Sequence, residues 1–289
     1  MTTPTTTRTV AVAVDGSDAN RAALDWAVMH AEAAGADLLV VTVAEPYEVI
    51  GPYVPEISPT EYLEPVVRAA VEKARETLPA ERVKTSLTLG HPVPVLQELS
   101  ASYDVLVLGK RGLGAFGRLV MGSTSIAVAG RSSAPVVVVP DGWEAQSRLD
   151  APVVVGVDVD KDHTAGLRFA FELAKARNVD LKAVQVWEPH PALTADSQVY
   201  LTAFDDWVAA SGAEFKTRLK EMATDFPDVV VEVVQVIGQP ARHLLEEASQ
   251  AQALVLGRDA KERLSGFSLG SVARGVLHHS DVPVAVIPA

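Results

Sequence analysis

The chain contains one segment twice. Residues 105–112 read Val-Leu-Val-Leu-Gly-Lys-Arg-Gly, and nine residues further on comes the pair Gly122-Ser123. Residues 253–260 read Ala-Leu-Val-Leu-Gly-Arg-Asp-Ala, and nine residues further on comes Gly270-Ser271. A repeated unit sets the number of domains before any other property is considered. The sequence therefore predicts two copies of one fold.

Matches upstream of this segment keep nearly the same spacing. Residues 10–15 match residues 153–158, which lie 143 positions later, and Gly90 matches Gly238, 148 positions later. The offset between the copies changes by only five residues along the unit, which indicates that the copies differ in length only within loops. We predict a frayed tail at 1–8, a first domain at 9–140, a linker at 141–150 and a second domain at 151–289.

Composition narrows the class of protein. The formal net charge is −12, which argues against a broad surface for nucleic acid or anionic membranes, because such surfaces need clustered Lys and Arg. The chain contains no cysteine, so disulfides and thiol chemistry play no part. No apolar run is long enough to span a bilayer, and the first residues lack an apolar signal core. We expect a cytoplasmic protein without nucleic-acid or membrane partners.

Strand and helix patterns alternate along each copy. In the first, apolar strand-like runs at 10–14, 38–43, 83–89, 105–108 and 136–139 are separated by helical patterns at 19–34, 62–78, 93–103 and 123–131. The second copy repeats the strands near 153–157, 181–186, 229–236, 253–256 and 284–287. Prolines between 46 and 65 predict a long loop, and we expect an insertion at about 189–205. The fold class is α/β: two tandem Rossmann-like, doubly wound domains, each with a mostly parallel five-stranded sheet.

A glycine-rich loop follows the fourth strand of the first copy. Ligands of open parallel sheets bind at the carboxyl ends of the strands, where this loop, the first-strand Asp15 and the end of the second strand meet. Glycines let backbone amides approach a phosphate, and a helix start adds free N–H groups. The residues that we expect to form the site are Asp15, Gly16, Ser17, Gly109, Lys110, Arg111, Gly112, Gly122, Ser123 and Thr124. From the residues alone, a structural glycine-rich turn remains the alternative to a phosphate site.

The spacing Gly109-x2-Gly112-x9-Gly122-Ser123, after a first strand that ends in Asp15, resembles the universal stress protein family. The resemblance covers both copies and implies ATP binding, with Mg²⁺ carried on the nucleotide. It implies that Asp15 and the Val41 backbone lie near adenine. On the same pattern, the loop glycines hold ribose and phosphate, and the residues at 122–124 hold phosphate.

The second copy departs from this pattern. Asp158, Val184, Gly257, Gly270 and Ser271 match, which marks them as weaker candidates for binding. Ala260 stands where the second loop glycine is expected, so its Cβ is expected to block an amide or to resist a positive φ. Asp259 replaces Arg111 and adds a negative charge. We therefore predict a competent first site and a weak or empty second site.

Three other motif matches carry little weight. Residues 112–117 fit G-x-G-x-x-G, but they follow the fourth strand rather than the first. Residues 266–270 fit G-x-S-x-G, but no strand directly precedes the serine. Residues 158–169 begin like a calcium loop, but His163 and Phe169 stand where Gly and Glu are required.

These observations favour a nucleotide-dependent regulator of the stress response. No side chain in either copy is a clear nucleophile or general base, so we expect at most slow ATP hydrolysis. The alternatives are an ATP-using enzyme and an interaction module with degenerate nucleotide sites. The last strands, at 136–139 and 284–287, are candidates for exposed sheet edges. We expect the two halves to pair through them, the chains to form a homodimer, and an unidentified protein to be the partner.

Overall fold

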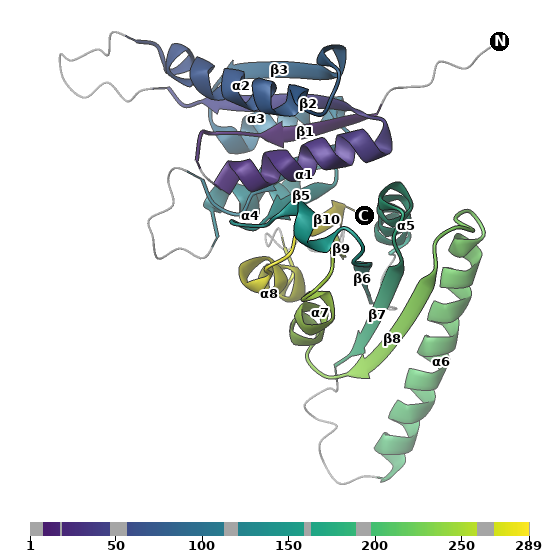
Figure 1. Cartoon of the computed structure of the whole chain (residues 1–289). Coiled ribbons are helices and arrows are strands. Elements are labelled where there is room, and N and C mark those ends of the chain that lie inside the picture. Colours follow the sequence, from purple (N-terminus) through teal and green to yellow (C-terminus); the bar gives the residue numbers. More distant parts are fainter. Residues whose placement is uncertain are drawn as a thin grey trace, which may run out of the picture. The chain divides into compact units, whose positions relative to one another are not determined.

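The computed structural model describes residues 8–17, 19–46, 57–112, 121–158, 163–188, 198–258 and 269–288. It divides into two compact units, Met1–Ser147 and Arg148–Ala289. The predicted α/β class is confirmed, because helices and strands alternate through both units (Figure 1). Among the described helices, none is long and apolar enough to cross a membrane.

The first unit is built on a five-stranded sheet in the order β3-β2-β1-β4-β5. Its strands are β1 (Thr9–Ala13), β2 (Asp37–Ala44), β3 (Val83–Leu89), β4 (Val105–Gly109) and β5 (Val136–Val139). All four neighbouring pairs are parallel. Parallel strands covered on both faces are apolar along their whole length, and all four residues of β5 are buried.

Two helices cover each face of this sheet. Helix α1 (Ala19–Ala34) and helix α2 (Pro59–Arg75) contact each other and pack on β1 to β4, while α3 (Pro92–Glu98) packs against α4 (Ser123–Arg131). One stripe of α1, made of Leu24, Ala27, Val28 and Ala31, is buried. The helix ends at Gly35, whose φ of +65° is the left-handed conformation common just after a helix.

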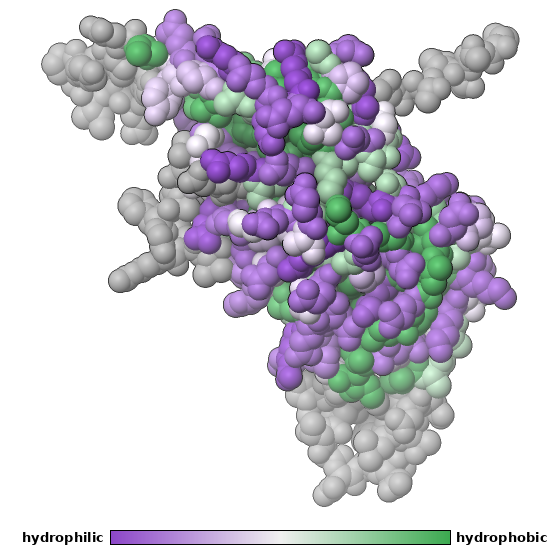
Figure 2. Space-filling view, in the orientation of Figure 1, coloured by the Kyte–Doolittle hydropathy of each residue, from purple (hydrophilic) through white to green (hydrophobic). Residues whose placement is uncertain are grey.

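The second unit repeats this arrangement in the order β8-β7-β6-β9-β10, again with parallel neighbours. Its strands are β6 (Val153–Val157), β7 (Leu181–Trp187), β8 (Val231–Ile237), β9 (Ala253–Arg258) and β10 (Val284–Pro288). Its helices are α5 (Thr164–Arg177), α6 (Gln198–Ala223), α7 (Pro240–Ala248) and α8 (Ser271–His279). Asn178 ends α5 at the position equivalent to Gly35, also with a positive φ. On the face shown in Figure 2, hydrophilic residues predominate, and hydrophobic residues gather over β7 and β8.

Three sequence-based boundaries were wrong. Helix α2 begins at Pro59, inside the predicted loop, because Ser58 and Glu61 form a capping box and proline is well tolerated in the first turn. The predicted third helix stops at Glu98 and continues as the 3₁₀ helix η2 (Leu99–Ser102), where two serines favour a tighter turn. In the predicted insertion, residues from Gln198 onward belong to α6.

Two further 3₁₀ helices complete the described elements. The helix η1 (Ala80–Arg82) leads into β3, and η3 (Ala145–Arg148) lies within the segment predicted as a linker. Arg82 fixes the first of these turns, because its guanidinium donates to the carbonyl oxygen of Ala31 at 2.7 Å and also to that of Ala36. The turn thereby ties the end of α1 to the start of β3.

Candidate functional site

A cavity of about 480 Å³ lies at the carboxyl ends of β1, β2 and β4 in the first unit. This is the edge at which open parallel sheets bind ligands. Eight of the eleven residues predicted for the first site line it: Asp15, Val41, Gly109, Arg111, Gly112, Gly122, Ser123 and Thr124. Residues from four separate segments of the chain therefore meet around one space.

The other three predicted residues do not line the cavity. Gly16 has a φ of +89°, and a Cβ at this position would lie 2.9 Å from Cγ2 of Val66. Ser17 donates its backbone N–H to Oδ1 of Asp15 at 2.9 Å. Lys110 is 8% exposed, and its N–H donates to the carbonyl oxygen of Val139 at 2.8 Å. The first two shape the turn that holds Asp15, and the third anchors the glycine-rich loop to β5.

Asp15 and Gly112 lie directly against each other. The carboxylate accepts hydrogen bonds from the Ser17 N–H and from Nδ2 of Asn20. A Cβ built on Gly112 would lie only 2.5 Å from Oδ2 of Asp15, closer than real Cβ contacts come. Gly112 has no positive φ, so backbone conformation is not what requires glycine here. Glycine therefore avoids a clash with the Asp15 carboxylate, which lies where a Cβ would stand.

The glycine-rich loop is fastened to the start of α4. The Gly122 N–H donates to the Lys110 carbonyl oxygen at 2.8 Å, and the buried Ser125 hydroxyl donates to the Gly109 carbonyl oxygen at 2.8 Å. Gly122 is the N-cap of α4 and supplies no side-chain cap. The first amides of a helix are not used within it, and Ser123 and Thr124, which carry two of them, line the cavity. This end of the cavity has the chemistry of an anion site.

One cationic side chain lines the described part of this cavity. Nε of Arg111 lies 2.5 Å from Oδ2 of Asp141, and both side chains are partly exposed. Arg111 therefore stands at the cavity with a carboxylate partner from the segment after β5. The opposite wall carries Glu45, whose Oε1 lies 3.6 Å from Nδ1 of His91.

Several lining residues escaped the sequence analysis. Asn20, Glu45, the α2 residues Pro59, Tyr62 and Leu63, and the α3 residues Pro92 and Leu96 all line the cavity. The capping box at Ser58 is a signal that would have placed the start of α2 correctly. Leu96 is further held by Tyr103, whose hydroxyl donates to the Leu96 carbonyl oxygen at 2.6 Å. Burial raises the pKa of Tyr103 to about 12, so this donor keeps its proton at neutral pH.

The second unit has a cavity of about 370 Å³ at the same edge of its sheet. All five weaker candidates line it: Asp158, Val184, Gly257, Gly270 and Ser271. Glu188, Pro240, Leu244 and Leu256 line it as well, at the positions equivalent to Glu45, Pro92, Leu96 and Leu108. The two cavities are therefore built from the same places in the repeated fold.

The start of α8 differs chemically from the start of α4. Val272 and Ala273 stand where the first unit has Thr124 and Ser125, and both line the second cavity. The alanine has no hydroxyl, so the bond that ties the glycine-rich loop to α4 has no counterpart here. The valine likewise removes a hydroxyl donor from the helix start.

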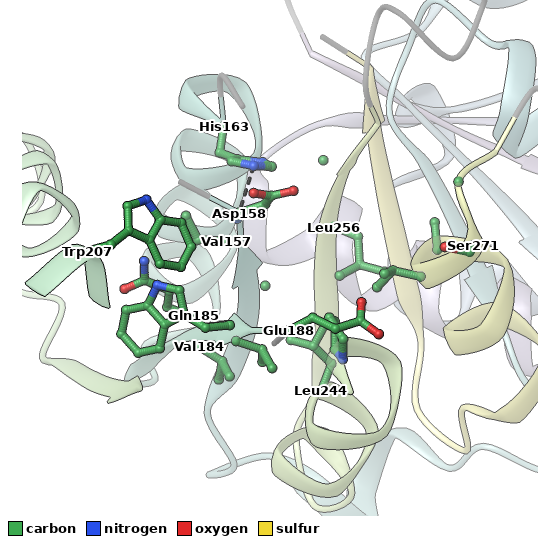
Figure 3. A pocket seen from close by; sticks show the side chains of 18 residues that line it. Val157, Asp158, His163, Val184, Gln185, Glu188, Trp207, Leu244, Leu256 and Ser271 are labelled. Carbon is green, nitrogen blue, oxygen red and sulfur yellow. Dashed lines mark hydrogen bonds between the residues drawn. The ribbon is translucent and has the colours of Figure 1, made fainter. Parts of the chain in front are cut away.

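His163 replaces Asn20 at the equivalent position, 143 residues later. Its Nε2 accepts a hydrogen bond from the Asp158 N–H at 3.0 Å (Figure 3). A Cβ on Gly257 would lie 2.8 Å from Nδ1 of His163, so the ring packs closely over the end of β9. Ala260 and Asp259, on which the prediction of a weak second site depended, lie outside the described residues.

In the described part of the chain, neither cavity contains a ready-made metal centre. Across the ranges that the structure describes, no group of three or more His, Cys, Asp or Glu side chains is placed to hold a metal ion. Of the calcium-like segment 158–169, only residues 159–162 lie outside those ranges, whereas most of the two glycine motifs at 112–117 and 266–270 does. The described residues offer amides, hydroxyls and isolated carboxylates instead.

Comparison with known proteins gives a consistent result. The model of the universal stress protein family matches residues 6–140 and 151–288. A universal stress protein of Mycobacterium tuberculosis, Rv2005c, is 33% identical over 298 residues, which cover 99% of each chain.

Solved structures agree with the fold. A crystal structure of a universal stress protein from Archaeoglobus fulgidus superposes with a TM-score of 0.67 at 20% identity, covering 97% of this chain and 96% of its own. A smaller universal stress protein, solved in complex with cAMP, is 28% identical and covers 47% of this chain and 98% of its own, with a TM-score of 0.38.

Proposed function

Because this chain belongs to the universal stress protein family, we propose that its first cavity binds ATP and that the chain acts as a nucleotide-dependent regulator in the stress response. The single observation that carries the proposal is the gathering of eight predicted residues around one cavity. A volume of about 480 Å³ lies within the range of small-molecule sites, which is about 300–1,000 Å³.

The lining suits a ligand that is anionic at one end. At the start of α4, the uncapped amides and the Ser123 and Thr124 hydroxyls are donors for phosphate oxygens. Arg111 adds positive charge once a phosphate competes with Asp141 for its guanidinium. Gly122, the N-cap of α4, leaves the backbone bare at this end. We propose that the triphosphate lies here and carries Mg²⁺ with it.

The other end of the cavity suits an adenosine group. Asp15 is held by two hydrogen bonds just after β1, and Val41, within β2, is fully buried. A carboxylate accepts hydrogen bonds from amino or hydroxyl groups and repels phosphate, so its place is near the base or the ribose. Tyr62 and Leu63 on α2 supply an apolar wall on the same side.

A regulatory role fits this lining better than dedicated catalysis. No described lining residue of the first cavity forms a hydrogen-bonded nucleophile–base pair of the kind that covalent catalysis uses. Binding would change the population of conformations and hence the choice of a protein partner. We further propose that the protein works in the cytoplasm as a homodimer, which light scattering tests by measuring a mass of about twice 30.6 kDa.

The test is to denature the purified chain and identify the released small molecules by liquid chromatography with mass detection. About one ATP or ADP per chain supports a single nucleotide site in the first unit, and about two per chain contradicts it. If none is released, the protein is dialysed against labelled Mg-ATP. Failure to take up label then rejects the proposal in favour of an interaction module.

A further inference from the structure

The second cavity contains two buried polar groups that the first cavity lacks. Gln185 is 1% exposed, and its Oε1 accepts a hydrogen bond from Nε2 of Gln235 at 2.8 Å, while its own Nε2 has no partner. Trp187 is 5% exposed, and its Nε1 also has no partner. Both side chains line the cavity. Buried donors are almost always satisfied in folded proteins, so these two indicate a ligand that brings acceptors.

Among the described residues, this strand brings such donors to the cavity in the second unit and not in the first. The equivalent positions on β2 are Thr42 and Ala44, 143 residues earlier; the Thr42 hydroxyl is also buried without a partner, but neither residue lines the first cavity. The difference therefore arises from substitutions on one strand of a shared fold.

The second cavity has also lost features that favour phosphate. Its described lining includes Asp158, Glu188 and His163 but neither lysine nor arginine. The accepting Nε2 of His163 carries no proton in this arrangement. Val272 and Ala273 bring no hydroxyl to the start of α8. A triphosphate placed here would lie beside two carboxylates without a lysine or arginine in the described lining to offset its charge.

The remaining walls suit a flat ring and a sugar. Trp207, 41% exposed, lies on one side of the cavity with Gln185, while Leu256 and Ser271 lie on the other side (Figure 3). Indole rings stack on planar heterocycles. The Asp158 and Glu188 carboxylates are acceptors for ribose hydroxyls.

We propose that the second cavity binds an uncharged nucleoside and discriminates against its phosphorylated forms. Ring nitrogens or carbonyl oxygens of the base accept from Gln185 Nε2 and Trp187 Nε1, and the base stacks on Trp207. The ribose hydroxyls donate to Asp158 and Glu188. This site does not depend on ATP binding in the first cavity.

The test is calorimetric titration of the full chain with adenosine, guanosine, cytidine and uridine, and with the four corresponding triphosphates. We expect at least one nucleoside to bind through the second cavity. Gln185→Leu removes a donor and should weaken this binding about tenfold. Thr42→Val, at the equivalent position in the first unit, is the matched control and should leave it unchanged. The triphosphate of the same base should bind this cavity at least about tenfold more weakly.

A second pair of variants covers the case in which Gln185→Leu unfolds the second unit. Trp207 is partly exposed, so its replacement leaves the buried core in place, which thermal unfolding checks. Trp207→Ala should weaken nucleoside binding, and Trp207→Phe should retain most of it. The proposal is overturned if no nucleoside binds, if Gln185→Leu and Trp207→Ala both leave binding unchanged, or if the triphosphate displaces the nucleoside from this cavity with equal affinity.

Discussion

Replacing Gly112 with alanine is the sharpest test of the first cavity. The added Cβ would lie 2.5 Å from Oδ2 of Asp15, and ordinary contacts of a Cβ begin near 3.4 Å. Something must therefore move by nearly an ångström. The Asp15 carboxylate is the nearest atom group, so we expect it to rotate away from the Ser17 N–H and from Asn20.

The size of the effect follows from the bonds at stake. A hydrogen bond to a charged group contributes about 1.5–3 kcal/mol, and each 1.4 kcal/mol is tenfold in affinity. A displaced carboxylate loses the bond that we propose between Asp15 and the base or ribose, which should weaken ATP binding by about 10- to 100-fold. Equilibrium dialysis of labelled Mg-ATP against wild type and Gly112→Ala measures this ratio directly.

Two controls separate the contact from a general effect of alanine. Gly275→Ala lies in α8, where the new Cβ meets Ala241 at 3.4 Å, and it should leave ATP affinity unchanged. In an Asp15→Ala background the clash is gone, so Gly112→Ala should then cost less than about twofold. An equal loss in both backgrounds would refute the reasoning.

Three further predictions concern the supports of the first cavity. Ser125→Ala removes the buried bond to the Gly109 carbonyl oxygen and should lower the free energy of unfolding by about 1–2 kcal/mol in urea titrations, with Thr124→Val as a partly exposed control. Ser58→Ala breaks the capping box of α2 and should lower the free energy of unfolding by about 1 kcal/mol. It should also weaken ATP binding. If neither the stability nor the ATP affinity changes, α2 is held by packing alone. Because burial raises the pKa of Tyr103 from 10.0 to about 12, its contribution to stability is complete below pH 10 and is lost as the pH rises toward 12. The gap in stability between wild type and Tyr103→Phe should therefore narrow over that window, and a constant gap would contradict the assignment.

The sheets could be predicted from the sequence to within one or two residues. Fully buried parallel strands are written as unbroken apolar runs, so β5 and β6 have the predicted bounds. The start of helix α2 was harder to predict. The prolines at 59 and 65 favoured a loop, and this signal was given more weight than the capping box at Ser58, which favours a helix start. Pro59 lies in the first turn, where its missing N–H is not needed, whereas Pro65 lies inside α2.

The backbone of the site was predictable and much of its side-chain lining was not. The glycines and the aspartate at the end of the first strand were predictable, because the rules that identify them relate residues that are close together in the sequence. Leu96 and Tyr62 reach the first cavity from helices whose orientation depends on packing across the sheet. Asn20 and His163 were missed although the constant offset of 143 pairs them, since their importance rests on contacts with Asp15 and Asp158 that no spacing reveals.

The two copies lie on one chain, and this has a genetic consequence. In an assembly of two identical subunits, every substitution appears at both sites, so neither site can change without the other. Here the codons for residues 124 and 125 are separate from those for 272 and 273, and the first pair is Thr-Ser while the second is Val-Ala. Each copy has been free to diverge alone, while translation keeps the ratio of the two sites at one to one in every cell.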